Sequence, residues 1–146
     1  MPSFAPMELA GSKTAEYLRE AFAAESASAA RNLYFAQKAD TEGHNEIAVA
    51  LRSVAEGCLS QAHGHLEYLQ ALGDPVTGEP LGHTTDNLRA ALAEQEAFGK
   101  DRYREMASQA KKDGLGEIAD WFKRLAETEK NHSRVFSEAL DELGDD

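Results

Sequence analysis

The stretch GEIADWFKRLAETEKNHSRVFSEAL, Gly116 to Leu140, carries the clearest helical pattern in the chain. Apolar residues recur at spacings of three and four, as they do on the buried face of a helix in a bundle. A glutamate and a histidine three residues apart interrupt this apolar face, which reads Ile118, Phe122, Leu125, Glu129, His132, Phe136 and Leu140. The stretch therefore predicts a bundle helix with a polar site on its inner face.

Three further segments have the same periodicity, are rich in Ala, Leu, Glu and Lys, and end at recognisable glycines. We expect helices over residues 12–42, 45–72, 85–113 and 115–143, with Thr84 or Thr85 capping the third. The segment 73–84 contains two of the four prolines and is predicted to be a linker. Two helical hairpins joined by a long crossover form one all-α domain, residues 1–146, of the ferritin-like four-helix bundle class.

The two halves of the chain repeat each other. YLREAFAAES (Tyr17 to Ser26) aligns with NLRAALAEQE (Asn87 to Glu96), and the second helices align at a constant offset of 71 residues from Gly43 and Gly114 onward. Such internal similarity indicates that one helical hairpin was used twice.

Polar residues interrupt the predicted inner faces of the other three helices as well. They are Glu25 in the first helix, Gln95 in the third, and Cys58 and Gln61 in the second. The repeat places Cys58 opposite Glu129 and Gln61 opposite His132. Inward Glu from two helices plus Glu-x-x-His from the other two is the ligand set of di-iron carboxylate bundles. The chain keeps half of this set.

Several segments resemble single-domain rubrerythrins, and the resemblance covers nearly the whole chain. They are AFAAES (Ala21 to Ser26), KADTEGHNEIA (Lys38 to Ala48), AHGHLEYL (Ala62 to Leu69), GDPVTGEPLG (Gly73 to Gly82), and EIADWF to EKNH (Glu117 to His132). The resemblance implies a ferritin-like di-iron protein that reduces hydrogen peroxide with an external electron donor. It also implies a homodimer, with exchange of helical hairpins between the two copies as one form.

The family pattern differs from this chain at most metal-facing positions. It expects Glu at Cys58, His at Gln61, and Glu at both Gln95 and Phe98. It also expects Tyr at Asn32, whereas Tyr103 matches a family tyrosine. No paired C-x-x-C motifs occur, so no rubredoxin module is predicted within these residues.

Three states of the site follow from the residues that remain. Glu25, Glu129 and His132 could hold one divalent metal, with Cys58 as a candidate fourth ligand, and this set suits zinc better than an iron pair. A metal-free polar core is the second state, in which the amides of Gln61, Gln95 and Asn32 donate hydrogen bonds to the two carboxylates. The third is a working two-metal site with rearranged ligands.

The segment AEGCLSQAHGH, Ala55 to His65, contains the only cysteine and an H-x-H pair. Residues two apart on a helix lie about 200° apart, so His63 and His65 cannot chelate one ion together. Reactive cysteines need a positive and partly exposed setting. Cys58 is therefore expected to be a small buried residue rather than a redox thiol.

The 146 residues carry 15 Lys and Arg against 26 Asp and Glu, a formal net charge of -11. This charge disfavours nucleic acid and anionic membranes as partners. One cysteine and no apolar run long enough to span a bilayer place the chain in the cytoplasm. The expected function is that of a rubrerythrin-like protein with a degenerate di-iron site; the alternatives are an active non-haem peroxidase or oxidase and a non-catalytic partner subunit of an intact paralogue.

Overall fold

The computed structural model describes residues 5–144 of the chain, which divide into two compact units at Leu72 and Gly73. Unit 1 contains the short helix α1 (Pro6–Leu9) and the helices α2 (Lys13–Thr41) and α3 (Asn45–Leu69). Unit 2 contains α4 (Thr84–Ala97), α5 (Lys100–Lys112) and α6 (Gly116–Leu143). The described residues form no strand, which confirms the predicted all-α class and is consistent with a ferritin-like helical bundle.

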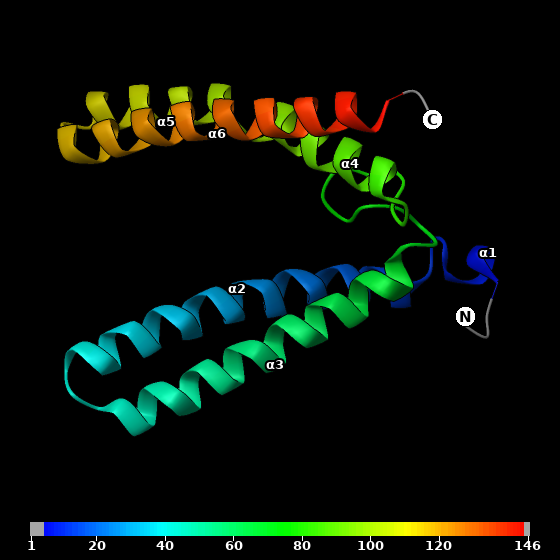
Figure 1. Ribbon diagram of the computed structural model, residues 1–146, viewed down its shortest axis with the longest axis horizontal. Helices are drawn as coiled ribbons and strands as arrows, with labels where there is room; N and C mark the ends of the chain where they lie inside the picture. The colour runs from blue at the N-terminus through cyan, green and yellow to red at the C-terminus, as the bar shows by residue number, and fades with distance from the viewer. Residues whose placement is uncertain (1–4, 145–146) are drawn as a thin grey trace. The chain divides into compact units, whose positions relative to one another are not determined.

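Each unit is an antiparallel helical hairpin (Figure 1). In unit 1, α2 packs along α3, and the turn between them uses Gly43 at a φ of 84°. In unit 2, α6 packs along both α4 and α5, and Gly114 has a φ of 77° in the corresponding turn. Because glycine has no Cβ, it adopts this left-handed conformation without steric cost. Both turns therefore lie where the sequence predicts them.

Alanines fill the contact between the two helices of unit 1. On α3 the fully buried residues Ala48, Ala55 and Ala62 are seven apart, so they return to the same face every two turns. Ala15, Ala29 and Ala36 occupy the facing positions of α2, and all six are at most 2% exposed. We call these six residues the alanine seam. Several larger apolar side chains of the hairpin are exposed, among them Leu33 at 41%, Val54 at 53% and Leu59 at 42%.

The repeat between the two units is also visible in their packing. Ala36 and Ala39 of unit 1 are buried, and so are Ala107 and Ala110 of unit 2, at the offset of 71. The same offset relates the buried residues Ala48 and Ala55 to Ala119 and Ala126. The second hairpin therefore reproduces the seam of the first.

The third helix is not continuous, and the prediction of one helix over 85–113 was wrong. It ends at Ala97 and resumes at Lys100, with Phe98 and Gly99 in extended conformations between them. A Cβ at Gly99 would overlap the main-chain carbonyl oxygen of Gln95, so only glycine fits. Glu25 of unit 1 corresponds to Gln95 of unit 2, which is 70 residues later in the chain. From Ala36 and Ala107 onward, corresponding residues are 71 apart, so unit 2 has one additional residue between these positions. The break thus accommodates one residue that α2 lacks.

The remaining element boundaries differ from expectation only slightly. The second helix ends at Leu69 rather than at 72, and α1 was not predicted. The residue before α4 is His83, and no side chain caps this helix, so neither Thr84 nor Thr85 acts as the cap. Within residues 5–144, no helix combines the length and the apolar character needed to cross a bilayer.

Candidate metal site

In unit 1, a chain of hydrogen bonds connects Cys58 of α3 to α2. The Cys58 thiol lies 3.6 Å from the Ser28 hydroxyl oxygen, and the Asn32 amide donates to the same oxygen at 3.2 Å. Asn32 also donates to the main-chain carbonyl of Ser28 at 2.9 Å. Within unit 1, the Asn32 amide therefore binds Ser28 and not the carboxylate of Glu25.

Glu25 lies on the same side of α2, one turn before Ser28. Its Oε2 is shielded from solvent and has no hydrogen-bond partner in the structure. Burial of a polar oxygen without a partner destabilises the fold, because the oxygen loses its water and gains nothing in return. Gln61, on α3, is exposed and forms no hydrogen bond within the unit. Unit 1 by itself therefore leaves Glu25 unsatisfied.

In unit 2, Glu129 and His132 lie one turn apart on α6 and contact each other. The distance from Glu129 Oε2 to His132 Nδ1 is 3.3 Å. The Glu129 side chain is 19% exposed, and that of His132 is 51% exposed. The Glu-x-x-His spacing thus brings together a carboxylate and an imidazole, as the sequence indicated.

Gln95 is the counterpart of Glu25 in the repeat, and its environment is similar. Gln95 Oε1 is also buried without a hydrogen-bond partner. Among the described residues that are not exposed, Glu25 Oε2 and Gln95 Oε1 are the two buried side-chain nitrogen or oxygen atoms without a hydrogen-bond partner. Both units thus keep an unsatisfied oxygen at the same position of the duplicated hairpin, although one residue is a carboxylate and the other an amide.

An aromatic cluster occupies the region next to the break in the third helix. The Phe98 ring meets the Tyr103 ring edge-on, with 5.3 Å between centroids, and Tyr103 lies 6.1 Å from Phe122. Such edge-to-face pairs stabilise a fold beyond the area that they bury. Phe98 therefore contributes an apolar contact at a position where the family pattern expects a carboxylate.

Within each unit, the structure shows which contacts the expected residues make. Glu129 contacts His132 in unit 2, whereas Cys58 contacts Ser28 in unit 1, a partner that the sequence did not identify. Ser28 lies three residues after Glu25 on the same helical side, and this spacing is the signal that could have revealed it. His63 is exposed, and His65 is partly buried.

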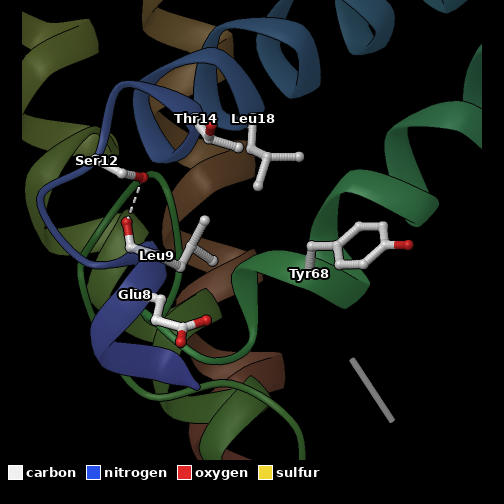
Figure 2. Close-up of a pocket in the computed structure, with 6 residues that line it drawn as sticks. All are labelled: Glu8, Leu9, Ser12, Thr14, Leu18 and Tyr68. Atoms are coloured by element: carbon white, nitrogen blue, oxygen red, sulfur yellow. Dashed lines mark hydrogen bonds between the residues drawn. The ribbon is translucent and has the colours of Figure 1, made fainter. Parts of the chain in front are cut away.

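A cavity of about 350 Å³ lies in unit 1, where α1 meets the start of α2 (Figure 2). Its lining residues are Glu8, Leu9, Ser12, Thr14, Leu18 and Tyr68. The Ser12 hydroxyl donates to the carbonyl oxygen of Leu9 at 2.6 Å, which holds α1 against α2 (Figure 2). None of the predicted metal ligands lines this cavity.

The residues at the predicted ligand positions differ from a di-iron ligand set. Within the part of the chain that the structure describes, no three His, Cys, Asp or Glu side chains are grouped to hold a metal. A di-iron centre uses four carboxylates and two imidazoles. At the corresponding positions this chain offers two carboxylates and one imidazole, and a thiol and two amides replace the other three ligands. A phenyl ring, that of Phe98, stands where the family pattern expects a further Glu.

The chain is similar to known proteins over most of its length. The Rubrerythrin family model matches residues 86–146. A rubrerythrin of Porphyromonas gingivalis is 33% identical over 139 residues, which cover 92% of this chain and 70% of that protein. Rubrerythrin-1 of Clostridium acetobutylicum is 31% identical over 143 residues, which cover 90% of this chain and 72% of that protein. With its duplicated helical hairpins and a similarity that extends through both of them, this chain belongs to the rubrerythrin family.

Proposed function

We propose that this chain is a rubrerythrin-fold protein in which the di-iron site is degenerate, so that peroxide reduction of the family type is weakened or lost. The site holds no metal or one divalent metal. The observation that carries the proposal is the replacement of ligands in both units by groups with other contacts: the Cys58 thiol binds Ser28, and the Phe98 ring meets the Tyr103 ring edge-on.

The chemistry of the replacements supports this proposal. Iron pairs that react with oxygen species need several anionic oxygen ligands to neutralise their charge, and an amide or a phenyl ring supplies none. Gln95 is neutral, and Phe98 has no donor atom at all. The third helix therefore offers no anionic ligand at either of its two expected positions.

Two observations, one in each unit, support the single-metal state over the metal-free state. Glu129 and His132 already lie 3.3 Å apart, and the carboxylate is mostly buried. In unit 1, Glu25 Oε2 is buried without a partner, and a cation would satisfy it. The proposed single-metal site requires that these residues of the two units meet. Two carboxylates and an imidazole are ligands that Zn²⁺ accepts, and Cys58 is the candidate fourth.

Zinc titration of the purified chain tests this function. We expect at most one Zn²⁺ per chain, bound at least tenfold more weakly after His132→Ala, since the imidazole is the strongest neutral ligand of the set. His63→Ala is the matched control, because His63 is exposed and away from the predicted ligands. Equal zinc affinity in the His132→Ala variant would exclude the single-metal state. Binding of two ions per chain would contradict the degenerate site itself.

A further inference from the structure

The side chains of Ser28, Asn32 and Cys58 meet at one oxygen atom in unit 1. The Ser28 hydroxyl oxygen lies 3.6 Å from Cys58 Sγ and accepts a hydrogen bond from Asn32 Nδ2 at 3.2 Å. Asn32 Nδ2 also donates to the main-chain carbonyl oxygen of Ser28 at 2.9 Å. Because a carbonyl oxygen can only accept, this second bond requires the amide nitrogen, and not the amide oxygen, to face Ser28. The direction of both bonds from Asn32 is therefore fixed.

The remaining bond of this group joins a thiol and a hydroxyl. A hydroxyl oxygen has two lone pairs, and the Asn32 amide occupies one of them. The second lone pair is a good acceptor, whereas the sulfur of a thiol is a weak one. The Cys58 thiol therefore donates to Ser28, and both acceptor positions of the Ser28 hydroxyl oxygen are filled.

The alanine seam explains why such short side chains can reach across the hairpin. Cys58 lies on α3 between the buried residues Ala55 and Ala62, and Ser28 lies on α2 beside the buried Ala29. Alanine contacts allow two helices to pack at the lower end of the usual range of interaxial distances, about 8 Å. Serine and cysteine each have a single heavy atom beyond Cβ, and at this distance the two atoms can meet. Both side chains are partly buried, so water competes less for the bond between them.

The second hairpin makes different contacts at the same positions. Before the break in the third helix, corresponding residues of the two units are 70 apart, and after it they are 71 apart. The corresponding pairs are Ser28 and Phe98, Asn32 and Tyr103, and Cys58 and Glu129. In unit 2 the two aromatic rings meet edge-on, and Glu129 contacts His132 of its own helix. In unit 1 the cysteine contacts the opposite helix instead. One position thus carries a carboxylate beside an imidazole in one unit and a link between two helices in the other.

The hydrogen bond to Ser28 uses the proton that a metal ligand would have to lose. Cysteine binds a metal ion as a thiolate. A thiolate has no proton to donate to Ser28, and its negative charge would face an oxygen atom whose other lone pair is already in use. Metal binding by Cys58 would therefore break this bond or reverse its direction. The link between the helices and metal binding compete for the same sulfur atom.

We propose that Ser28 is a positioning residue that holds Cys58 as a hydrogen-bond donor, so that Cys58 joins α2 to α3 and is not a metal ligand. The proposal deepens the proposed function, because it removes Cys58 from the candidate ligands and leaves Glu25, Glu129 and His132. It rests on contacts within unit 1 alone, and it holds whether or not the chain binds a metal.

Infrared spectroscopy of the full chain, with EDTA present, tests the direction of the bond. The chain has one cysteine, so the S–H stretching band reports on Cys58 alone. Donation of a hydrogen bond weakens the S–H bond and lowers the frequency of this band. Ser28→Ala is expected to raise the frequency because the acceptor is removed, whereas Ser28→Thr keeps the hydroxyl and is expected to leave the frequency unchanged. Ser60→Ala, at an exposed position of α3, is the matched control and should leave it unchanged too.

A double-mutant cycle in the same buffer measures whether the contact joins the helices. Ser28→Ala and Cys58→Ala are each expected to lower the melting temperature by about 2–5 °C. The double variant should lose at least about 2 °C less than the sum of the two single losses, because either substitution alone already removes the shared bond. Ser60→Ala again serves as the control, since it reports the gain in helix propensity from serine to alanine.

Three results would overturn the proposal: a folded wild-type chain without an S–H band, a band that Ser28→Ala does not shift, or additive losses in the cycle. If circular dichroism shows that Ser28→Ala does not fold, Ser28→Thr is compared with Ser28→Val, which has a methyl group in place of the hydroxyl. The frequency must then be higher in Ser28→Val. Failure of the proposal would return Cys58 to the candidate ligands and leave the degenerate site standing. Two irons per chain would contradict the degenerate site without changing the contact in unit 1.

Discussion

Restoring the four replaced positions should raise the iron content of the purified chain from less than one to about two ions per chain. The variant combines Cys58→Glu, Gln61→His, Gln95→Glu and Phe98→Glu. It returns two carboxylates and one imidazole, which complete a set of four carboxylates and two imidazoles, and through Phe98→Glu it also restores the further Glu that the family pattern expects. Gln95→Glu acts directly at a buried oxygen that has no partner. Iron per chain is measured by mass spectrometry after expression with excess iron.

A control with the same added groups separates a restored site from general iron binding. It carries Ser53→Glu, Ser60→His, Ser108→Glu and Ser137→Glu, all at exposed positions. This control should hold no more iron than the wild-type chain. Consumption of hydrogen peroxide is a second readout, expected to increase in the restored variant alone. Failure of a folded restored variant to bind iron would show that more than the ligands has been lost.

Gly99→Ala should destabilise the chain by about 2–3 kcal/mol, because the added Cβ would overlap the main-chain carbonyl of Gln95. For a chain of this length, that loss lowers the melting temperature by about 5–10 °C. The Cβ position is fixed by the main chain of residue 99, and the atom that it meets is the main-chain oxygen of Gln95, so rotation of a side chain cannot relieve the clash. Thermal unfolding followed by circular dichroism provides the measurement.

Gly57→Ala is the matched control for this substitution. Gly57 lies within α3, and a Cβ there meets no atom within 4 Å. Alanine is favoured over glycine inside a helix by about 1 kcal/mol, so this variant should be slightly more stable than the wild type. If Gly99→Ala is also stabilising, the third helix runs continuously through residues 97–100, and the break does not absorb the additional residue of unit 2.

The helical hairpins could be predicted because their signals are local. Gly43 and Gly114 end helices of strong periodicity, and the repeat at an offset of 71 identifies the second hairpin from the first. The contact of Glu129 with His132 follows from residues three apart on one helix. These features need no knowledge of how distant segments pack.

The break at Gly99 and the partner of Cys58 depend on longer-range geometry. A single glycine costs a helix only about 1 kcal/mol, so Gly99 alone did not argue for a break. The shift in offset from 70 to 71 was present in the sequence, but it locates the additional residue only between 96 and 107. The contact of Cys58 with Ser28 depends on the register of α2 against α3, which the packing of the alanine seam determines.

The exposed side chains of Leu33 and Leu59 illustrate a third kind of information. The pattern of apolar residues does not distinguish a side chain buried within a hairpin from one exposed on its surface. Comparing the two halves of the chain makes this distinction, because Leu33 and Arg104 occupy equivalent positions. The internal repeat thus allows each surface residue of one hairpin to be compared with the residue at the equivalent position of the other.

The iron content of the wild-type chain tests the central claim most directly. The protein is expressed with excess iron, purified without chelators, and analysed by mass spectrometry for metal per chain. A degenerate site predicts fewer than about one iron per chain, because the remaining ligands cannot neutralise two ions. About two irons per chain, retained through purification, would contradict the account and would mean that the chain assembles a di-iron centre with a rearranged set of ligands.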